Sequence, residues 1–481
     1  MNLPAPFQRA ALILRQTWDL WTGSGTGASS TALLAWKGAA AGDRLSQWWP
    51  PSTDFSSYLN PALLKNRARD AHRNNPWARR AVDLLVNYVC GIGLKPMIDL
   101  SDPALRARVG KLWAAWSEQA DFSGFHSFAG LQAEAFRTCL VDGEALALIR
   151  PGPVLKIQLL PNEFLAPQKD NAIDIGGGIE YDQEGRRVGY WLYSKIPPQA
   201  LNPVPTFVPV DRVVHLFAPL KPGYERGITW LAPALVALYE LQTFMETSLV
   251  RARTGSLFAG FIRSADGTPV LGEAAEGPTP FEPGSIARLR PGDEISFTQP
   301  PDPSQAYAGF ISTQLRAIAS ALDVPYELLA NDVNAVTFAS GRHSLLAFER
   351  VCDSLVQNLV AYQFCRPIWN WWVKIQVAKG ELPEEILTAP VRWVAPEFQT
   401  LDARMTTNAT VQKIRAGILS RSEAVSSTGA DPEALDEQIA TDNARADRLG
   451  LIFDSDPRRV TLQGLEQPSE ANDGTPAPTI Q

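Results

Sequence analysis

The most regular hydrophobic pattern in the chain lies between residues 229 and 380, where apolar side chains recur every three or four positions. In residues 229–254, one apolar stripe occupies one side of the predicted helix, and Val236, Tyr239, Thr243 and Val250 occupy another. A helix that is apolar on two sides cannot bury both against one core, so we expect it to need neighbours on two sides. We predict that the first stripe forms a subunit interface, and its members are Leu235, Leu238, Leu241, Met245 and Leu249.

A second helix is predicted over residues 302–325, with Asp302 as its N-cap and Pro303 in its first turn. Residues 255–301, between the two helices, contain short strand-like runs separated by Pro-Gly and Asp-Gly turns, which indicates a small β-rich module. The second helix adds three apolar residues to the predicted interface, namely Phe310, Leu315 and Ile318.

A polar loop is predicted over residues 326–343, before a long helix over residues 344–380 that Pro367 is expected to kink. The loop is rich in small and uncharged polar side chains that offer hydrogen bonds. Its candidate functional residues are Asn331, Asp332, Asn334, Thr337, Ser340 and Arg342. The alternative is that the loop simply links two helices.

The rest of the chain predicts an α+β fold that is mainly helical. A helix over residues 61–88 is expected to bend or split at Asn74-Asn75-Pro76, because the residue before a proline disfavours helical backbone. Two amphipathic helices follow, the second with Ser127 as its N-cap. Alternating runs then predict strands at 145–149, 155–160, 179–181, 188–193 and 212–217. After residue 380 we expect one strand at 391–394 and helices at 401–416, 420–426 and 432–449.

Both ends of the chain have loop-like composition. Residues 1–60 predict a flexible arm that either docks on a neighbouring molecule or stays disordered, and residues 458–481 predict a disordered tail. The helix at 61–88 is basic, but its arginines are spread around its surface. That spread favours a solvated or subunit-pairing face over DNA contact.

The net charge, the lack of long apolar runs and the spacing of the cysteines limit the classes of protein to which the chain can belong. The net charge of −7 argues against a protein that grips nucleic acid by phosphate neutralisation, because that requires a basic surface. No apolar run approaches the ~20 residues of a membrane span, and no signal peptide is evident at the N-terminus. The separated cysteines, Cys90, Cys139, Cys352 and Cys365, are interpreted as buried thiols, and we place assembly in a reducing cytoplasm.

Catalytic signatures are not found in the sequence. It contains no nucleotide-binding G-x-x-x-x-G-K-[ST] motif, and its four histidines form no metal-binding spacing. His343 and Ser344 are adjacent, but adjacent helical residues point apart and no acid is placed to complete a triad. We therefore predict no enzyme activity, no cofactor and no metal.

Several short phrases together resemble one known family. They include Arg73-Asn74-Asn75-Pro76-Trp77-Ala78, Asp142-Gly143-Glu144-Ala145 and Val213-Val214-His215-Leu216-Phe217. Further phrases stand at 69–70, 90–96, 178–182, 225–233, 324–329 and 338–342. In this order, over roughly residues 62–449, they resemble the lambda-type portal proteins of tailed phages.

The resemblance implies a portal architecture along the chain. Its parts are an arm (1–60), a wing (61–228), a first stem helix (229–254), a clip (255–301), a second stem helix (302–325), a tunnel loop (326–343), a long wing helix (344–380), a helical crown (381–457) and a tail (458–481).

The resemblance also implies a function and a set of partners. A ring of twelve subunits at one capsid vertex of the virion would pass double-stranded DNA without sequence specificity during packaging and ejection, in an active phage or a prophage. The implied partners are the terminase large subunit, head–tail adaptors, and capsid and scaffold proteins, with no membrane. The alternative is a ring-forming adaptor or scaffold with no role as a DNA conduit.

Overall fold

A computed structural model describes residues 61–166, 175–194, 204–219, 222, 226–257, 261–264, 293–296, 305–334, 336–395, 403–428, 432–451, 453 and 458. The chain divides into two compact units, residues 1–61 and 62–481, and all the described residues except Pro61 belong to the second. The predicted arm, most of the predicted clip and nearly all of the predicted tail lie outside the described residues. So do Asp302, the predicted N-cap of the second stem helix, and Pro303 in its predicted first turn.

The first helices show how local sequence sets element boundaries. The predicted split gives α3 (Pro61–Asn74) and α4 (Pro76–Val89). The Asn75 side chain caps α4 by accepting hydrogen bonds from the backbone N–H groups of Trp77 and Ala78, each at 3.1 Å. The next helices, α5 (Pro103–Ser117) and α6 (Phe128–Asp142), begin after the capping residues Asp102 and Ser127, as predicted for Ser127.

Two small sheets form the β part of the predicted wing. A three-stranded antiparallel sheet has the order β3-β2-β8, built from β2 (Glu144–Arg150), β3 (Lys156–Leu160) and β8 (Val213–Phe217). A four-stranded sheet has the order β4-β5-β6-β7, with β4 (Ile175–Gly176), β5 (Ile179–Tyr181), β6 (Arg187–Tyr193) and β7 (Pro205–Pro209). The sequence pattern did not predict β4 and β7.

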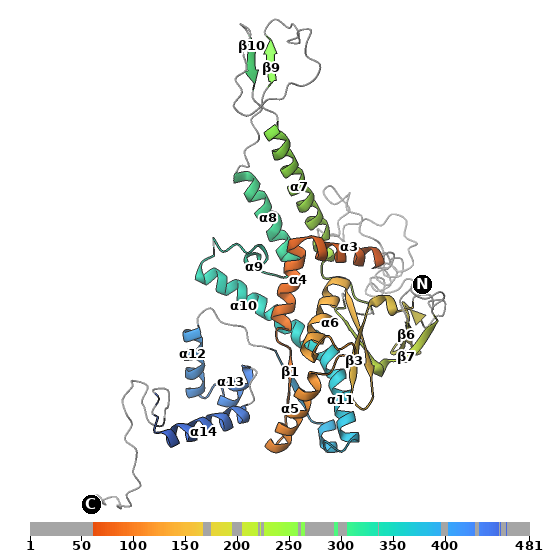
Figure 1. The fold of residues 1–481 in the computed structure, drawn as a ribbon, viewed down its shortest axis with the longest axis vertical. Coiled ribbons are helices and arrows are strands. Elements are labelled where there is room, and N and C mark those ends of the chain that lie inside the picture. Colours follow the sequence, from red (N-terminus) through yellow and green to blue (C-terminus); the bar gives the residue numbers. More distant parts are fainter. Residues whose placement is uncertain are drawn as a thin grey trace, which may run out of the picture. The chain divides into compact units, whose positions relative to one another are not determined.

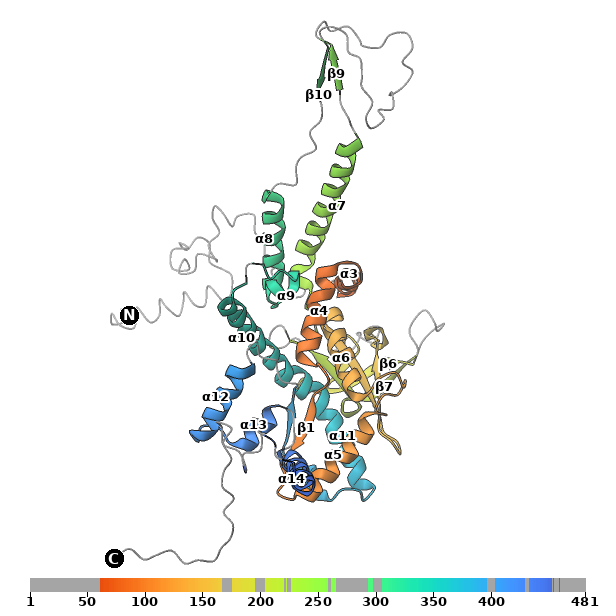
Figure 2. The same cartoon turned by 60° about the vertical axis from the view of Figure 1, so that its left-hand side comes forward.

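The two stem helices run side by side in both views (Figures 1 and 2). They are α7 (Leu235–Leu257) and α8 (Gln305–Ala321), and Phe244 joins them through ring contacts with Tyr307 and Phe310 at 5.5 and 4.8 Å. A short 3-10 turn, η6 (Ala232–Ala234), replaces the predicted first turns of α7 around Pro233. Of the predicted β-rich insert, the hairpin of β9 (Phe261–Ser264) and β10 (Asp293–Ser296) is described.

The long helix is continuous but irregular. It consists of α10 (Phe338–Leu355), the π-helix η7 (Val356–Cys365) and α11 (Arg366–Ala378). Proline removes one backbone donor and crowds the preceding turn, so the wide π turns immediately before Pro367 accommodate the predicted disruption. The helix begins at Phe338 rather than at residue 344, because Thr337 and Ser340 form a capping box there.

The core is aromatic and joins distant segments. Trp113 of α5 lies within 5.1 Å, centroid to centroid, of both Trp369 and Trp372 of α11, and within 5.8 Å of Trp393. Trp393 belongs to β11 (Val391–Val394), which pairs with β1 (Lys95–Ile98), a strand that the sequence pattern did not predict.

The remaining described helices are η3 (Asn162–Phe164), η5 (Val210–Arg212), α9 (Tyr326–Ala330), η8 (Glu384–Leu387), α12 (Ala403–Arg415), α13 (Arg421–Ser427) and α14 (Pro432–Leu449).

Candidate assembly and channel site

The stem residues predicted to meet a neighbouring subunit divide into two groups. Four of them are buried inside the single chain: Leu238, Leu241, Leu315 and Ile318 have exposed fractions of 1%, 2%, 6% and 0%. They belong to the main core, so they are not available to another subunit and the prediction is corrected there. The rest are partly or largely accessible: Leu235 and Met245 are half-buried against the core, Phe310 packs on Phe244, and Leu249 is exposed.

The other apolar side of α7 is the one left open. Val236 is 73% exposed, Tyr239 69% and Val250 59%. Thr243, also exposed, lies on the same side of the helix, four residues after Tyr239 and seven residues, or about two turns, before Val250. The sequence therefore identified two apolar sides correctly but assigned the intersubunit role to the side that the chain's own core covers.

The predicted tunnel loop is shorter than expected. Tyr326–Ala330 form helix α9, and Asn331 ends that helix in the left-handed conformation, with φ of 53°. Because α10 begins at Phe338, no more than residues 331–337 connect the two helices, and residue 335 among them lies outside the described residues. Ser340 and Arg342, which were predicted to lie in the loop, stand on the first turns of α10.

The polar groups of this loop mainly bind one another. Asp332 accepts hydrogen bonds from the Tyr326 hydroxyl at 3.1 Å and from the Asn334 backbone N–H at 3.2 Å. The bond from the Asn334 backbone, with those from the Tyr326 hydroxyl and the Asn334 side chain, lowers the pKa of the Asp332 carboxyl. Thr337 and Ser340 bind each other in the capping box. The expected free hydrogen-bonding capacity is therefore largely used within the loop.

The side chains exposed to solvent around the loop include apolar residues and arginines. Val333 is 69% exposed and Phe338 57%. Three exposed arginines accompany them: Arg316 stacks over the Tyr326 ring at 4.8 Å, Arg80 donates to the Leu328 carbonyl at 3.1 Å, and Arg342 lies on α10.

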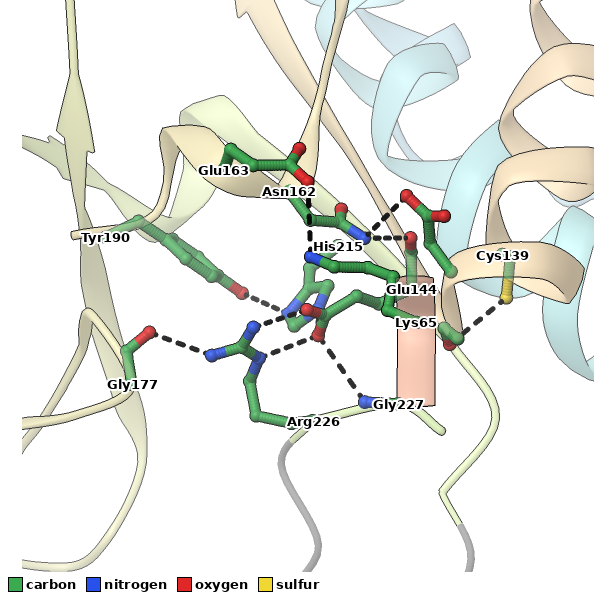
Figure 3. Close-up of polar contacts among 12 residues, drawn as sticks. Lys65, Cys139, Glu144, Asn162, Glu163, Gly177, Tyr190, His215, Arg226 and Gly227 are labelled. Atoms are coloured by element: carbon green, nitrogen blue, oxygen red, sulfur yellow. Dashed lines mark hydrogen bonds and ion pairs between the residues drawn. The ribbon is translucent and has the colours of Figure 1, made fainter. Parts of the chain in front are cut away.

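A buried polar cluster fixes the segment that leads into the stem (Figure 3). Arg226 donates from Nε to Glu144 Oε2 at 2.7 Å, bonds Glu144 Oε1 with its other arm, and donates to the Gly177 carbonyl at 3.0 Å. His215 Nε2 lies 3.1 Å from Glu144 Oε2, and its Nδ1 lies 3.4 Å from the Tyr190 hydroxyl. One carboxylate on β2 therefore holds side chains from β8 and from the stem's lead-in.

Two glycines, Gly143 and Gly227, allow the backbone before β2 to pack closely against the backbone before the stem. Gly143 has φ of +93°, and a Cβ built on it would lie 2.6 Å from the carbonyl carbon of Ile228. A Cβ on Gly227 would lie 1.9 Å from the Gly143 carbonyl oxygen. Any side chain at either position would separate the two backbones.

Hydrogen bonds extend the junction to both stem helices. The Trp230 backbone N–H and the Thr229 hydroxyl donate to the Leu140 carbonyl of α6 at 2.9 and 3.1 Å. The Trp230 indole donates to the Leu322 carbonyl, just after α8, at 3.1 Å. The lead-in to one stem helix is thus bound to the end of the other.

Electrostatics in the cluster favours a charged Glu144 and a neutral His215. Burial by itself raises the pKa of Glu144, but hydrogen bonds from Arg226 and His215 outweigh it and hold the pKa well below its usual range. Burial lowers the pKa of His215, and the neighbouring Glu144 offsets only part of that effect.

The side chains at the junction bind one another and hold the segments of the chain together. The His215 side chain is only 1% exposed, so it cannot reach a substrate directly. Among the described residues, no group of three His, Cys, Asp or Glu side chains is placed to hold a metal ion. In the same part of the chain, none of the helices combines the length and apolar character that crossing a membrane requires.

The junction residues lie in three of the short phrases that carry the family resemblance, but nothing in the sequence connects these phrases to one another. The phrases are Asp142-Gly143-Glu144-Ala145, Val213-Val214-His215-Leu216-Phe217 and residues 225–233. The structure brings them together at one place. An isolated acid, histidine and Arg-Gly pair, far apart along the chain, give no local pattern that predicts their contact.

Comparison with known proteins identifies the class to which this architecture belongs. The sequence matches the phage portal proteins of the lambda family over residues 41–355, so the chain belongs to that family. It is a phage portal subunit with a mainly helical α+β fold.

Individual relatives agree with this assignment. The chain is 24% identical over 463 residues to a probable portal protein of Halomonas phage phiHAP-1, covering 89% of each chain. It is 24% identical over 362 residues to portal protein B of Escherichia phage lambda, covering 64% of this chain and 68% of that one. Its fold is similar to a chain in the neck of an empty GTA particle, with a TM-score of 0.51, 18% identity, and coverage of 78% of this chain and 95% of that one.

Proposed function

We propose that twelve copies of this chain close into a ring at one vertex of a phage head, and that the ring is the channel for double-stranded DNA during packaging and ejection. The observation that carries the proposal is the open apolar stripe of α7, formed by Val236, Tyr239, Thr243 and Val250. Exposed apolar stripes of this kind mark surfaces that another protein covers.

A closed ring follows from the kind of contact that this stripe requires. The stripe lies on one side of α7, whereas the exposed side of α8 carries a single large apolar side chain, Phe310 at 44%, among mostly small or polar residues such as Gly309, Thr313, Arg316, Ala317 and Ser320. In the proposed ring, the stripe of one copy meets a different surface on the next copy. Such head-to-tail contacts generate rings when the rotation between copies closes.

The loop at 331–337 and the arginines beside it form the proposed channel constriction. Val333 and Phe338 give it a hydrophobic rim, and Arg342 supplies a cation that can contact phosphate. A few such contacts in a chain of net charge −7 hold DNA weakly and without sequence specificity. We assign no enzyme activity to the subunit, so movement of DNA needs a separate motor.

The β9–β10 hairpin and the surrounding residues 255–301 form the proposed docking surface for that motor, the terminase large subunit, and later for head–tail adaptors. Capsid and scaffold proteins would contact the ring at the head vertex. In this proposal the ring assembles in the cytoplasm of the host and becomes part of the virion.

The stem test uses residues that the single chain leaves exposed. The double variant Val236→Asp/Tyr239→Asp places charge on the open stripe. It should leave the far-UV circular dichroism of the subunit unchanged while native mass measurement and negative-stain microscopy show monomers instead of rings. The matched variant Val236→Ile/Tyr239→Phe keeps the stripe apolar and should form rings. Normal rings from the double aspartate variant would refute the assigned interface.

A buried residue provides the contrasting variant. Leu238→Asp puts an unpaired charge in the core and should unfold the base of the stem, because burying an isolated carboxylate is very unfavourable. Loss of fold in this variant, with retained fold in the stripe variant, separates the two sides of α7.

DNA conduction is tested separately from assembly. Arg342→Glu should allow rings to form but lower the fraction of DNA-filled heads in a complementation assay. Arg350→Glu, on the same exposed helix two turns farther from the loop, is the control. If both variants give normal DNA-filled heads, Arg342 has no role in the channel. If rings form but never enter heads, a scaffold without a conduit role replaces the proposal.

A further inference from the structure

We infer that Phe125 is an aromatic knob that inserts into an aromatic socket on the adjacent copy of this chain. We define the socket by Tyr190, Val210, Phe217, Pro219, Tyr362 and Pro367, which line one cavity. The inference rests on the proposed ring and adds a second, independent contact to it, in the wing rather than in the stem.

The knob is the most exposed large apolar side chain in the described part of the chain. Phe125 is 86% exposed, and Phe122 in the same loop is 50% exposed. A phenylalanine ring left in water raises the free energy of the unassembled subunit, and its burial in a partner would favour assembly. Aromatic side chains of this kind dominate protein interfaces when they fill a pocket.

The loop that carries the knob is rigidly held. Asp121 is 4% exposed, and its carboxylate accepts hydrogen bonds from the backbone N–H groups of Ser123, Phe125 and His126 at 3.0, 2.9 and 3.1 Å. Three such bonds to one buried carboxylate fix the backbone at Phe125 itself. Little backbone entropy is therefore lost when the ring is bound, which favours binding.

The base of the loop is joined to the sheet. Ile157 of β3 donates its N–H to the Ala120 carbonyl at 2.8 Å and accepts from the Phe122 N–H at 2.9 Å. The Arg150 guanidinium lies over the Phe122 ring, 4.6 Å from its centroid. The knob thus projects from a segment that extends the β3 edge of the sheet.

The socket has the size and chemistry to receive a phenyl ring. Its cavity volume is about 860 Å³. A cavity of about 150 Å³ already holds a benzene molecule. Tyr362 is 61% exposed, so part of the lining is open to an incoming side chain. Arg187 also lines the cavity, with its guanidinium 5.4 Å from the Phe217 centroid, and can make a similar cation–π contact with the bound ring.

Knob and socket lie at opposite edges of one sheet. The strand order β3-β2-β8 places the Phe125 loop beyond β3, whereas Phe217 of β8 lines the socket and donates its N–H to Gln363 of η7 at 3.0 Å. The two surfaces therefore do not overlap. A ring subunit needs two different, complementary surfaces of this kind, one for each neighbour.

Disulfide trapping tests the contact in the assembled ring. All four native cysteines are buried, so a Phe125→Cys/Val210→Cys variant carries only two accessible thiols. Mild oxidation of its rings should give a ladder of covalent multimers on a non-reducing gel, and Phe125→Cys/Tyr362→Cys tests a second lining position. The control Ile92→Cys/Val210→Cys places the thiol on another exposed apolar residue, 76% exposed, and should stay monomeric on the gel.

The outcomes separate this inference from the proposed ring. Rings seen by microscopy that cross-link no better than the Ile92 control would overturn the knob and socket while leaving the ring intact. Unmodified protein that never forms rings would overturn both.

A second measurement avoids any dependence on disulfide geometry. Phe125→Ser should raise the subunit concentration at which rings dissociate at least tenfold, whereas Phe125→Tyr should leave it within twofold. Equal dissociation for both variants and the unmodified chain would also overturn the knob.

Discussion

Arg226 and Glu144 form a buried ion pair in which both arms of the guanidinium bind the carboxylate, one of them at 2.7 Å. The two residues are 82 positions apart in the sequence. The carboxylate is nearly inaccessible, with a side-chain exposure of 5%. The pair therefore fixes the entry to the stem against the central strand of the wing sheet.

Removing the charge of Glu144 should destabilise the subunit strongly. In Glu144→Gln the Arg226 guanidinium loses its counter-charge in a mostly buried site. Breaking one partner of a buried pair costs about 3 kcal/mol or more. Chemical denaturation of the subunit measures the change. The control Arg186→Gln breaks an exposed ion pair with Glu184 and should change the free energy of unfolding by less than about 1 kcal/mol. Equal effects of the two variants would contradict a structural role for the junction.

Acidification should weaken the fold through His215 before it affects Glu144. The pKa of His215 is lower in the folded chain than the usual value of about 6.5, so the unfolded chain binds its proton first as the pH falls. The free energy of unfolding is therefore not reduced by this histidine above the unfolded pKa. Below that pKa it falls by up to about 1.4 kcal/mol per pH unit for one proton. The lowered pKa of Glu144 acts in the same direction, but only below the usual carboxyl pKa of about 4.3.

The measurement is the free energy of unfolding at pH 7.5 and pH 5.5. His215→Gln should reduce the loss of stability between these values. Burial also lowers the pKa of His72, so His72→Gln measures the remaining histidine contribution. An unchanged pH dependence in His215→Gln would show that this residue titrates equally in the folded and unfolded chain.

A methyl group at Gly143 should destabilise the fold much more than a methyl group at a glycine with open space where the Cβ would lie. Gly143→Ala combines left-handed strain, about 1–2 kcal/mol, with a clash against the backbone of Ile228. Gly185 has φ of +76° and nothing within 4 Å of a built Cβ, so Gly185→Ala carries the strain alone. We expect a clearly lower thermal midpoint for Gly143→Ala than for Gly185→Ala. Similar midpoints would mean that the two backbones separate at little cost.

The native thiols should be unreactive. Burial raises the pKa of Cys90, Cys139 and Cys352 to about 12 and raises that of Cys365 as well. Because the thiolate is the reactive form, a chromogenic disulfide reagent at pH 8 should label almost no cysteine in the native subunit and all four in denaturant. Rapid labelling of one native thiol would indicate local opening around that residue.

How far the sequence predicts the structure depends on the range of the interactions involved. Asn75 and Ser127 act on backbone groups two or three residues away, so the helix starts they set could be predicted. Which apolar side of α7 stays exposed could not be predicted, because Leu238 and Val236 are both apolar and only the position of the core distinguishes them.

The buried junction also could not be predicted from local sequence patterns, because its residues are far apart along the chain. Glu144, His215 and Arg226 come from β2, β8 and the segment before the stem, so only the tertiary fold brings them together. The same holds for β1, whose partner β11 lies almost 300 residues later in the chain. The loop at 331–337 was predicted too long because its polar residues suggested solvent contact, whereas Thr337 and Ser340 serve to start a helix.

The hydrogen bond from the Trp230 indole to the Leu322 carbonyl has a mechanical consequence. It connects the entrance of one stem helix to the exit of the other, and the same tryptophan's backbone N–H is bonded to α6. Both stem helices are therefore tied to one tryptophan, which is itself tied to α6, so displacement of either helix strains a hydrogen bond of the same residue.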